Sequence, residues 1–291
     1  MHHLIEELLT AGVIITDGGW GTQFQEKGLP LGAAPDEWNL TDPEKVIAVA
    51  KSYVDAGSGI ILTNTFGANY YTLKKSGLEA KVAEMNRRGV ELSKAAAEGT
   101  ATKVFASLGP SGIILMMGEV SADELEAAFS VQAENMAAGG ADGIVVETMS
   151  DPEEAAVAVR AAKKTGLPVV ACMVFDSGKN LDRTMMGTTP EQAAETLLAA
   201  GADIIGSNCG KGVEGFLPIC QRLADASGRK VWIKANRGLP EVRDGKTHYA
   251  QTPEQFADFA PALIEAGAGF LGGCCGTSPE FIAALKKKLS E

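Results

Sequence analysis

Short apolar runs alternate with longer segments of helical character along the whole chain. The runs are nearly continuous in Val, Ile, Leu, Ala and Gly, which is typical of parallel strands covered on both faces. They span Val13–Asp17, Gly59–Thr65, Lys103–Leu108, Gly143–Thr148, Pro168–Phe175, Asp203–Asn208, Lys230–Ala235 and Gly269–Gly273. The pattern therefore predicts eight buried parallel strands.

Helical patterns fill the intervals between these runs. They span Pro43–Asp55, Leu78–Glu98, Ala122–Ala138, Pro152–Lys164, Pro190–Ala200, Gly215–Ala226, Pro253–Ala266 and Pro279–Leu289. Several begin with a capping residue followed by Pro and Glu, which is the chemistry of a helix start. Several end in Gly immediately before the next apolar run, as in Gly201-Ala202-Asp203.

Eight strand–helix units in 291 residues fit the usual size of a closed (β/α)8 barrel of the TIM type. No linker or change in composition divides the chain, so we expect residues 1–291 to form a single domain. The segment Met1–Thr10 is expected to be a short helix that closes the bottom of the barrel.

The formal net charge of −11 disfavours a surface for nucleic acid, which requires excess positive charge. No run of 18 apolar residues occurs and the N-terminus carries no signal pattern. We therefore expect no membrane span and a cytoplasmic location.

Three cysteines lie where the chemistry of such a barrel is found, at the C-terminal ends of strands. Cys209 follows the sixth run, and Cys274 and Cys275 follow the eighth. Three thiolates at one point favour zinc, and three protein ligands leave one position open, as in catalytic zinc sites. An open position can hold an incoming thiol as thiolate, ready to attack an alkyl group.

Other interpretations of the cysteines remain open on spacing alone. The vicinal pair Cys274-Cys275 could pack in the core or form a strained disulfide. The odd total of five cysteines argues against a disulfide framework. The remaining two, Cys172 and Cys220, are expected to be small core residues.

The motifs resemble those of the homocysteine S-methyltransferase family, and more closely the homocysteine-binding module of cobalamin-dependent methionine synthase than the betaine enzymes. The resemblance extends along the whole chain. It rests on Asp17-Gly18-Gly19, Thr63-Asn64-Thr65-Phe66, Ser107-Leu108-Gly109-Pro110, Glu147-Thr148-Met149, Arg183–Thr188, Gly206–Gly210, Asn236 with Gly238-Leu239-Pro240, and Gly272–Thr277.

The resemblance implies that Cys209, Cys274 and Cys275 are the catalytic ligands of Zn²⁺ and that the substrate thiolate takes the fourth place. It also implies that Asp17 and Glu147 meet the substrate ammonium. As alternatives, Asp17 starts a turn and Glu147 belongs to a structural ion pair.

The same resemblance implies a set of contacts to the substrate carboxylate: the backbone N–H groups of Gly18 and Gly19, with Thr65 and Ser107 nearby. Asn236 matches a residue that fills the fourth zinc position in the absence of substrate, or it is a turn residue.

Two charged residues depart from the expected pattern, because Lys234 and Arg237 flank Asn236. They are expected either to contact an anionic group of a partner or donor, or to be solvated. The segment Met116–Glu119 also looks shorter than its usual counterpart, which affects the outer substrate pocket.

The function implied by the resemblance is methylation of homocysteine to methionine. Nothing in the chain resembles a folate-binding or cobalamin-carrying domain, so we expect an external methyl donor, such as methylcobalamin or methylfolate, free or on a separate corrinoid or folate-binding protein. One alternative is a corrinoid-linked methyltransferase or demethylase acting on another thiol or on another methylated sulfur or nitrogen compound. Another is a non-enzymatic zinc- or redox-sensing barrel.

Overall fold

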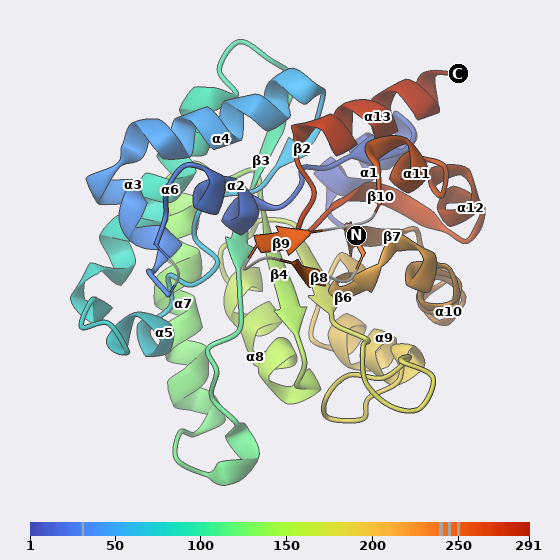
Figure 1. Ribbon diagram of the computed structural model, residues 1–291. Coiled ribbons are helices and arrows are strands. Elements are labelled where there is room, and N and C mark those ends of the chain that lie inside the picture. Colours follow the sequence, from blue (N-terminus) through green and yellow to red (C-terminus); the bar gives the residue numbers. More distant parts are fainter. Residues whose placement is uncertain (31, 239–240, 244–245, 249–250) are drawn as a thin grey trace.

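Eight parallel strands form a barrel at the centre of the computed structural model (Figure 1), which describes residues 1–30, 32–238, 241–243, 246–248 and 251–291. The strands are β1 (Ile14–Ile15), β2 (Ile60–Ile61), β3 (Lys103–Leu108), β4 (Gly143–Met149), β5 (Val169–Met173), β6 (Ile204–Gly212), β7 (Val231–Asn236) and β10 (Ala268–Gly273). They are ordered β1-β10-β7-β6-β5-β4-β3-β2. A parallel bridge between Thr16 and Ile60 joins the two outer strands and closes the barrel.

Helices surround this sheet on its outer side (Figure 1). The longer ones are α4 (Pro43–Ala56), α6 (Val82–Ala96), α7 (Ala122–Ala138), α8 (Pro152–Lys163), α9 (Pro190–Ala199), α10 (Leu217–Ser227) and α13 (Pro279–Ser290). Shorter helices are α1 (His3–Thr10), α2 (Trp20–Glu26), α3 (Trp38–Thr41), α5 (Tyr70–Lys74), α11 (Pro253–Ala257) and α12 (Ala260–Glu265). In the described ranges, no helix is both long and apolar enough to cross a membrane. The predicted TIM-type barrel is confirmed.

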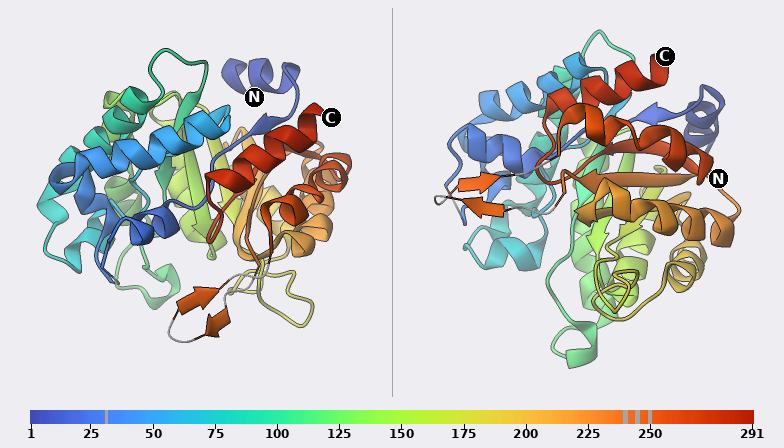
Figure 2. Two further views of the ribbon diagram at one scale, coloured as in Figure 1. Left: turned by 45° about the horizontal axis from the view of Figure 1, so that its top comes forward. Right: turned by 45° about the vertical axis from the view of Figure 1, so that its right-hand side comes forward.

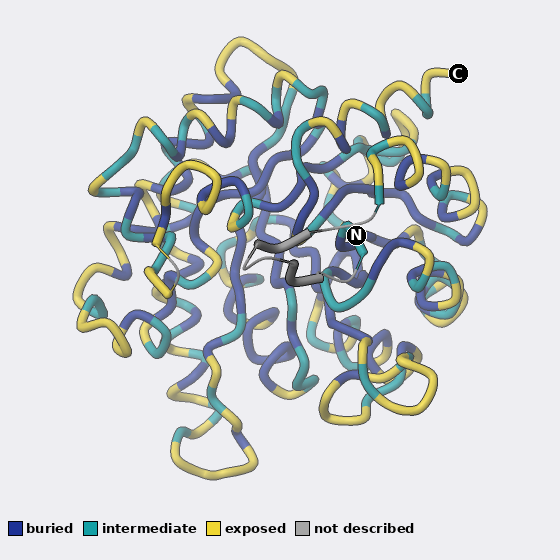
Figure 3. Tube along the Cα trace, viewed as in Figure 1, coloured by how far each residue is buried: buried dark blue, intermediate teal, exposed yellow. Residues whose placement is uncertain are grey.

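The half of the barrel interior that lies next to α1 is apolar. Side chains alternate between the two faces of each strand, so every second residue points inward. The inward residues form one buried cluster with α1, made of Ile5, Ile60, Leu62, Phe105, Val145, Val170, Cys172, Ile204, Trp232 and Phe270. The buried interior of the strands contrasts with the exposed outer faces of the helices in Figure 3. Cys172 belongs to this cluster, and Cys220 is fully buried on α10, as predicted for both.

The two ends of the barrel differ in structure (Figure 2). Helix α1 covers one end, where Ile5 inserts into the apolar cluster. At the opposite end lie the loops that follow the strands and the hairpin β8–β9 (Glu241–Arg243 and Lys246–His248). That hairpin follows β7 and was not predicted, because the segment carries no clear strand pattern.

One predicted helix is divided in the structure. The segment Pro253–Ala266 forms α11 and α12, separated at Asp258 and Phe259. Pro261 has no N–H to donate to Ala257, and its ring would clash with that carbonyl in a continuous helix. The break therefore has a local cause.

The closing role of α1 predicts a stability effect at Ile5. Ile5→Ala removes a fully buried side chain from the apolar cluster and is expected to cost about 2–5 kcal/mol. The measurement is the urea-unfolding midpoint. Glu7→Ala, at an exposed position of the same helix, is the control and should leave the midpoint nearly unchanged. Equal midpoints for Ile5→Ala and Glu7→Ala would contradict the closing role.

Candidate metal centre and substrate cavity

Three cysteine sulfurs meet above the C-terminal end of β7. Strand β7 lies between β6 and β10, with Asn208 paired to Lys234 on one side and Gly273 to Ala235 on the other. Cys209 and Cys274 are the next residues on the two flanking chains, and Cys275 follows. The three Sγ atoms lie within 4.8 Å of one another, and those of Cys209 and Cys275 are 3.9 Å apart. The predicted convergence of Cys209, Cys274 and Cys275 is confirmed.

The backbone around each cysteine is held by specific contacts. Cys209 has a left-handed φ of 63°, at an irregularity of β6 between Asn208 and Gly212. The Cys274 N–H donates to the Ala235 carbonyl (2.7 Å), and the Cys275 N–H donates to Asn236 Oδ1 (3.0 Å). A left-handed conformation in a non-Gly residue costs about 1–3 kcal/mol and persists only where surrounding contacts enforce it.

Glycine permits the close approach of the first loop to this centre. A Cβ at Gly19 would lie 2.6 Å from the Cys274 carbonyl oxygen, and one at Gly272 would lie 2.0 Å from Thr16 Oγ1. Both positions therefore exclude larger residues.

The three thiols influence one another's protonation. Hydrogen bonds between the Cys209 sulfur and the thiols of Cys274 and Cys275 lower the pKa of Cys209. The same contacts with Cys209 raise the pKa values of Cys274 and Cys275. These contacts thus favour the thiolate form of Cys209 over those of Cys274 and Cys275.

The cluster fits zinc. All three cysteines are free thiols. Zinc–sulfur bonds of about 2.3 Å in a tetrahedron separate neighbouring sulfurs by about 3.8 Å, close to the 3.9 Å between Cys209 and Cys275. Soft thiolate donors favour zinc over magnesium or calcium. Three ligands leave one coordination position for another group.

A cavity of about 580 Å³ adjoins the three cysteines, and all three line it. Much of its wall is apolar and comes from Trp20, Phe24, Leu62, Phe66 and Leu73. The buried polar side chains of Ser107, Glu147 and Lys234 form the part of the cavity called the inner end here. A mostly apolar cavity with few convergent polar groups is typical of a small-molecule site.

Glu147 and Ser107 form part of this polar inner end, and their expected contacts with a substrate stay a prediction. The Ser107 hydroxyl donates to Glu147 Oε1 (2.5 Å), and Asn208 Nδ2 donates to Oε2 (3.2 Å). Burial raises the pKa of Glu147, although Lys234 and the Ser107 hydroxyl oppose this.

Asn208 connects the Glu147 carboxylate to the cysteine cluster. Its Nδ2 also contacts Thr148 Oγ1 (2.7 Å) and lies 3.9 Å from the Cys274 sulfur, while its Oδ1 accepts the Thr148 N–H (2.8 Å). Thr148 has a left-handed φ of 62°. Asn208 therefore holds a strained residue of β4 beside the cysteine cluster. Sequence reasoning did not assign it a role, although it immediately precedes Cys209.

Asp17 lies behind the cavity wall and is paired with Lys234. It is fully buried and does not line the cavity. Its Oδ1 accepts from Lys234 Nζ, and its Oδ2 accepts from Trp20 Nε1 (2.6 Å) and the Leu62 N–H (2.6 Å). In the structure Asp17 thus belongs to an ion pair within the chain, and its expected contact with a substrate ammonium stays a prediction.

Lys234 points into the barrel because it lies two residues after the inward Trp232. It is 2% exposed and lines the cavity. Burial by itself lowers the pKa of Lys234, but Asp17 and Glu147 outweigh burial and raise it. The expectation that Lys234 is solvated is wrong. The two-residue alternation along β7 was the signal that could have placed it inside.

The remaining predicted substrate residues take different places. Thr65 is fully buried, outside the cavity wall, and its hydroxyl donates to the Ser107 carbonyl (2.7 Å). Gly18 and Gly19 line the cavity. The Gly19 N–H donates to the Thr277 carbonyl (3.1 Å), whereas that of Gly18 has no acceptor among the described residues. Asn236 supports the Cys275 backbone and donates to the Cys209 sulfur.

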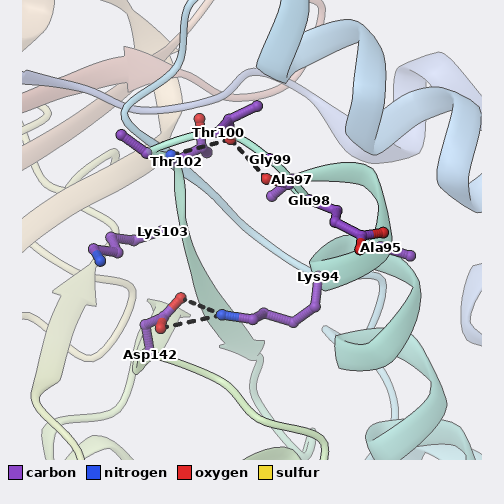
Figure 4. A pocket seen from close by; sticks show the side chains of 10 residues that line it. Lys94, Ala95, Ala97, Glu98, Gly99, Thr100, Thr102, Lys103 and Asp142 are labelled. Atoms are coloured by element: carbon purple, nitrogen blue, oxygen red, sulfur yellow. Dashed lines mark hydrogen bonds and ion pairs between the residues drawn. The ribbon is translucent and has the colours of Figure 1, made fainter.

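A second hollow, of about 460 Å³, lies at the N-terminal ends of β3 and β4 (Figure 4). The Lys94 ammonium and the Asp142 carboxylate pair across it at 3.0 Å, and Asp142 also accepts the Val104 N–H (2.8 Å). Asp203 makes the same contact to Val169 at the start of β5 (2.9 Å). Because the arrangement is repeated, we interpret these aspartates as structural contacts that join the starts of neighbouring strands.

Asp36, which also lines the substrate cavity, makes stability depend on pH. Burial raises its pKa to about 7, with the Gly67 N–H opposing. The folded protein then binds this proton more tightly than the unfolded chain, so stability falls as pH rises from 4 to 7, by about 1.4 kcal/mol per pH unit.

We therefore expect Asp36→Asn, which cannot ionise, to lose less stability than the wild type between pH 5 and pH 8. Urea unfolding at both pH values measures this difference. The variant Asp55→Asn, at an exposed carboxylate, should follow the wild type. Parallel losses in the wild type and Asp36→Asn would contradict the assignment.

Comparison with known proteins shows the family. The family model described as Homocysteine S-methyltransferase matches residues 14–289. Methionine synthase of Mycobacterium leprae is 28% identical over 294 residues, covering 95% of this chain and 24% of that protein. Methionine synthase of Mycobacterium tuberculosis is 27% identical with the same coverage. The chain thus spans about a quarter of the length of these relatives.

Solved structures show the same fold. The metallated form of the homocysteine methyltransferase MmuM from Escherichia coli matches with a TM-score of 0.82 and 23% identity, over 99% of this chain and 100% of that chain. Its oxidized form matches with a TM-score of 0.78 and 23% identity, over 95% and 96%. Because the family model covers nearly the whole barrel, the chain belongs to the homocysteine S-methyltransferase family, a family of methyltransferase enzymes.

Proposed function

We propose that this chain is a zinc-dependent thiol S-methyltransferase, in which Cys209, Cys274 and Cys275 hold the metal and an acceptor thiol enters from the cavity. The observation that carries the proposal is that three free thiols converge on the wall of the same cavity that contains the charged inner end. The acceptor named by the family is homocysteine, whose methylation gives methionine.

The metal, when bound, lowers the pKa of the acceptor thiol and so supplies a thiolate at neutral pH. The three cysteine thiolates give the centre net negative charge, which keeps the acceptor sulfur electron-rich. Apolar side chains of the cavity wall pack around the acceptor in this proposal. A carbon–sulfur bond forms as the bond between the methyl group and its donor breaks.

The residues around the cavity divide into binding and supporting groups in this proposal. Glu147, Ser107 and the N–H of Gly18 face the acceptor. Asp17 and Thr65 act from behind the wall, by fixing Lys234 and the backbone of β3. Asn236 orients the cysteine loop and would lie beside a metal held by Cys209 and Cys275.

The methyl donor is proposed to approach from the open end of the barrel, free or on a separate corrinoid or folate-binding protein. The loops following β3 and β5 support a large donor, since they expose apolar side chains at that end: Met116 is 76% exposed and Met185 71%. Lys234 favours a second candidate for the acceptor, a thiol other than homocysteine, because its charge lies where a substrate ammonium was expected.

The proposal predicts that each of Cys209→Ser, Cys274→Ser and Cys275→Ser lowers bound zinc from about one per chain to near zero. Methyl transfer to a thiol acceptor should fall by at least about 100-fold. Zinc content is measured by elemental analysis. Turnover is measured with methylcobalamin, methylfolate, S-adenosylmethionine, S-methylmethionine and betaine as donors.

The chain provides its own controls. Cys172→Ala and Cys220→Ala alter buried cysteines that do not belong to the cluster and should keep zinc and turnover. A serine variant at position 209, 274 or 275 that retains both full zinc and full turnover would overturn the proposal.

A further inference from the structure

The inner end of the substrate cavity already contains an ammonium group of the chain itself. Lys234 Nζ donates to Asp17 Oδ1, and the Lys234 charge also interacts with Glu147. Two buried carboxylates are a typical binding pair for one ammonium. Here a residue of the chain fills that role before any substrate enters.

This ammonium retains capacity to bind a ligand. An ammonium carries three N–H donors, and Asp17 is the one acceptor of Lys234 Nζ among the described residues. Two donors therefore remain on a side chain that lines the cavity. The Gly18 N–H, also on the cavity wall and without an acceptor in the described part of the chain, adds a third donor.

The two carboxylates near Lys234, those of Glu147 and Asp17, are poorly suited to bind a second ammonium. Both oxygens of Glu147 already accept a hydrogen bond, from Ser107 and from Asn208. Asp17 is fully buried and has a donor on each oxygen. A second ammonium placed here would meet the like charge of Lys234 in a desolvated site, which is costly.

We infer that Lys234 sets the acceptor specificity of this enzyme, by favouring thiols that carry a carboxylate or similar anion and lack an α-ammonium group. The inference rests on the proposed function, since it names the substrate class of the same cavity. The acceptor site of this chain would therefore differ from a site that binds an amino-acid thiol. In the preferred complex the acceptor anion pairs with Lys234 and the Gly18 N–H, and its sulfur lies at the cysteine cluster.

L-Homocysteine and two thiols that each lack one of its charged groups test this class. 4-Mercaptobutanoate is homocysteine without its α-amino group, and 3-mercaptopropylamine is homocysteine without its carboxylate. Isothermal titration of the zinc-loaded wild type is expected to show 4-mercaptobutanoate binding at least about tenfold more tightly than L-homocysteine, with 3-mercaptopropylamine the weakest.

Substitution of Lys234 should reverse the order. Lys234→Met leaves Asp17 without a cation, so the homocysteine ammonium should take its place and bind at least about tenfold more tightly than 4-mercaptobutanoate. Should the unpaired Asp17 carboxylate prevent folding, the double variant Asp17→Asn with Lys234→Met removes both charges. The dissociation constants of this double variant for 4-mercaptobutanoate and L-homocysteine are expected to lie within about threefold of each other.

A matched control is available at the rim of the same cavity. Lys75 lines the cavity but is exposed. Lys75→Met removes the same charge from the outer part and should keep the wild-type order of the three thiols. A purely structural role for Lys234 would lower stability without changing that order.

The outcomes separate the two proposals. If none of the three thiols binds the zinc-loaded wild type, the proposed function is overturned, and the inference with it. If thiols bind but the wild type prefers L-homocysteine, or if Lys234→Met leaves the order unchanged, the inference alone is overturned.

Discussion

The position of β7 between β6 and β10 determines which side chains meet at the mouth of the barrel. Parallel register places Asn208 and Gly272 on either side of Lys234, so the chains leaving the flanking strands converge above it. Cys209 lies on the side of β6, and Cys274 and Cys275 lie on the side of β10. Lys234 lies directly beneath them, on the inward face of the strand between. The cysteine cluster and the charged inner end of the cavity are consequences of this single arrangement.

The convergence is maintained at the expense of local backbone strain. Cys209 and Thr148 both adopt left-handed conformations, and Asn208 contacts Thr148, Glu147 and Cys274 simultaneously. The cost of the strain is offset by the surrounding closed sheet, which cannot relax at one strand without disturbing its neighbours. A rigid cysteine cluster is useful to a thiol methyltransferase, because the acceptor sulfur must be held while a separate donor approaches.

Much of this fold and part of this site could be predicted from the sequence. Continuous apolar runs and capped helices define the barrel, and the barrel in turn places strand-end residues together, so the cysteine cluster followed from Cys209, Cys274 and Cys275. Contacts across the barrel interior could not be predicted in the same way. The pairing of Asp17 with Lys234 depends on side-chain reach between strands that are not neighbours in the sheet, and strand position alone does not determine it. Thr65 illustrates the same limit, since its hydroxyl bonds to the β3 backbone instead of facing the cavity.

The central claim is that three cysteine sulfurs of this chain bind zinc and leave one position for an acceptor thiol. Zinc K-edge X-ray absorption of the purified, zinc-loaded protein tests it most directly. We expect three sulfur neighbours at about 2.3 Å with one oxygen or nitrogen, and four sulfur neighbours after addition of a thiol that the enzyme methylates. An unchanged spectrum after addition of a thiol that the enzyme methylates would contradict it, as would fewer than three sulfur neighbours in the protein alone.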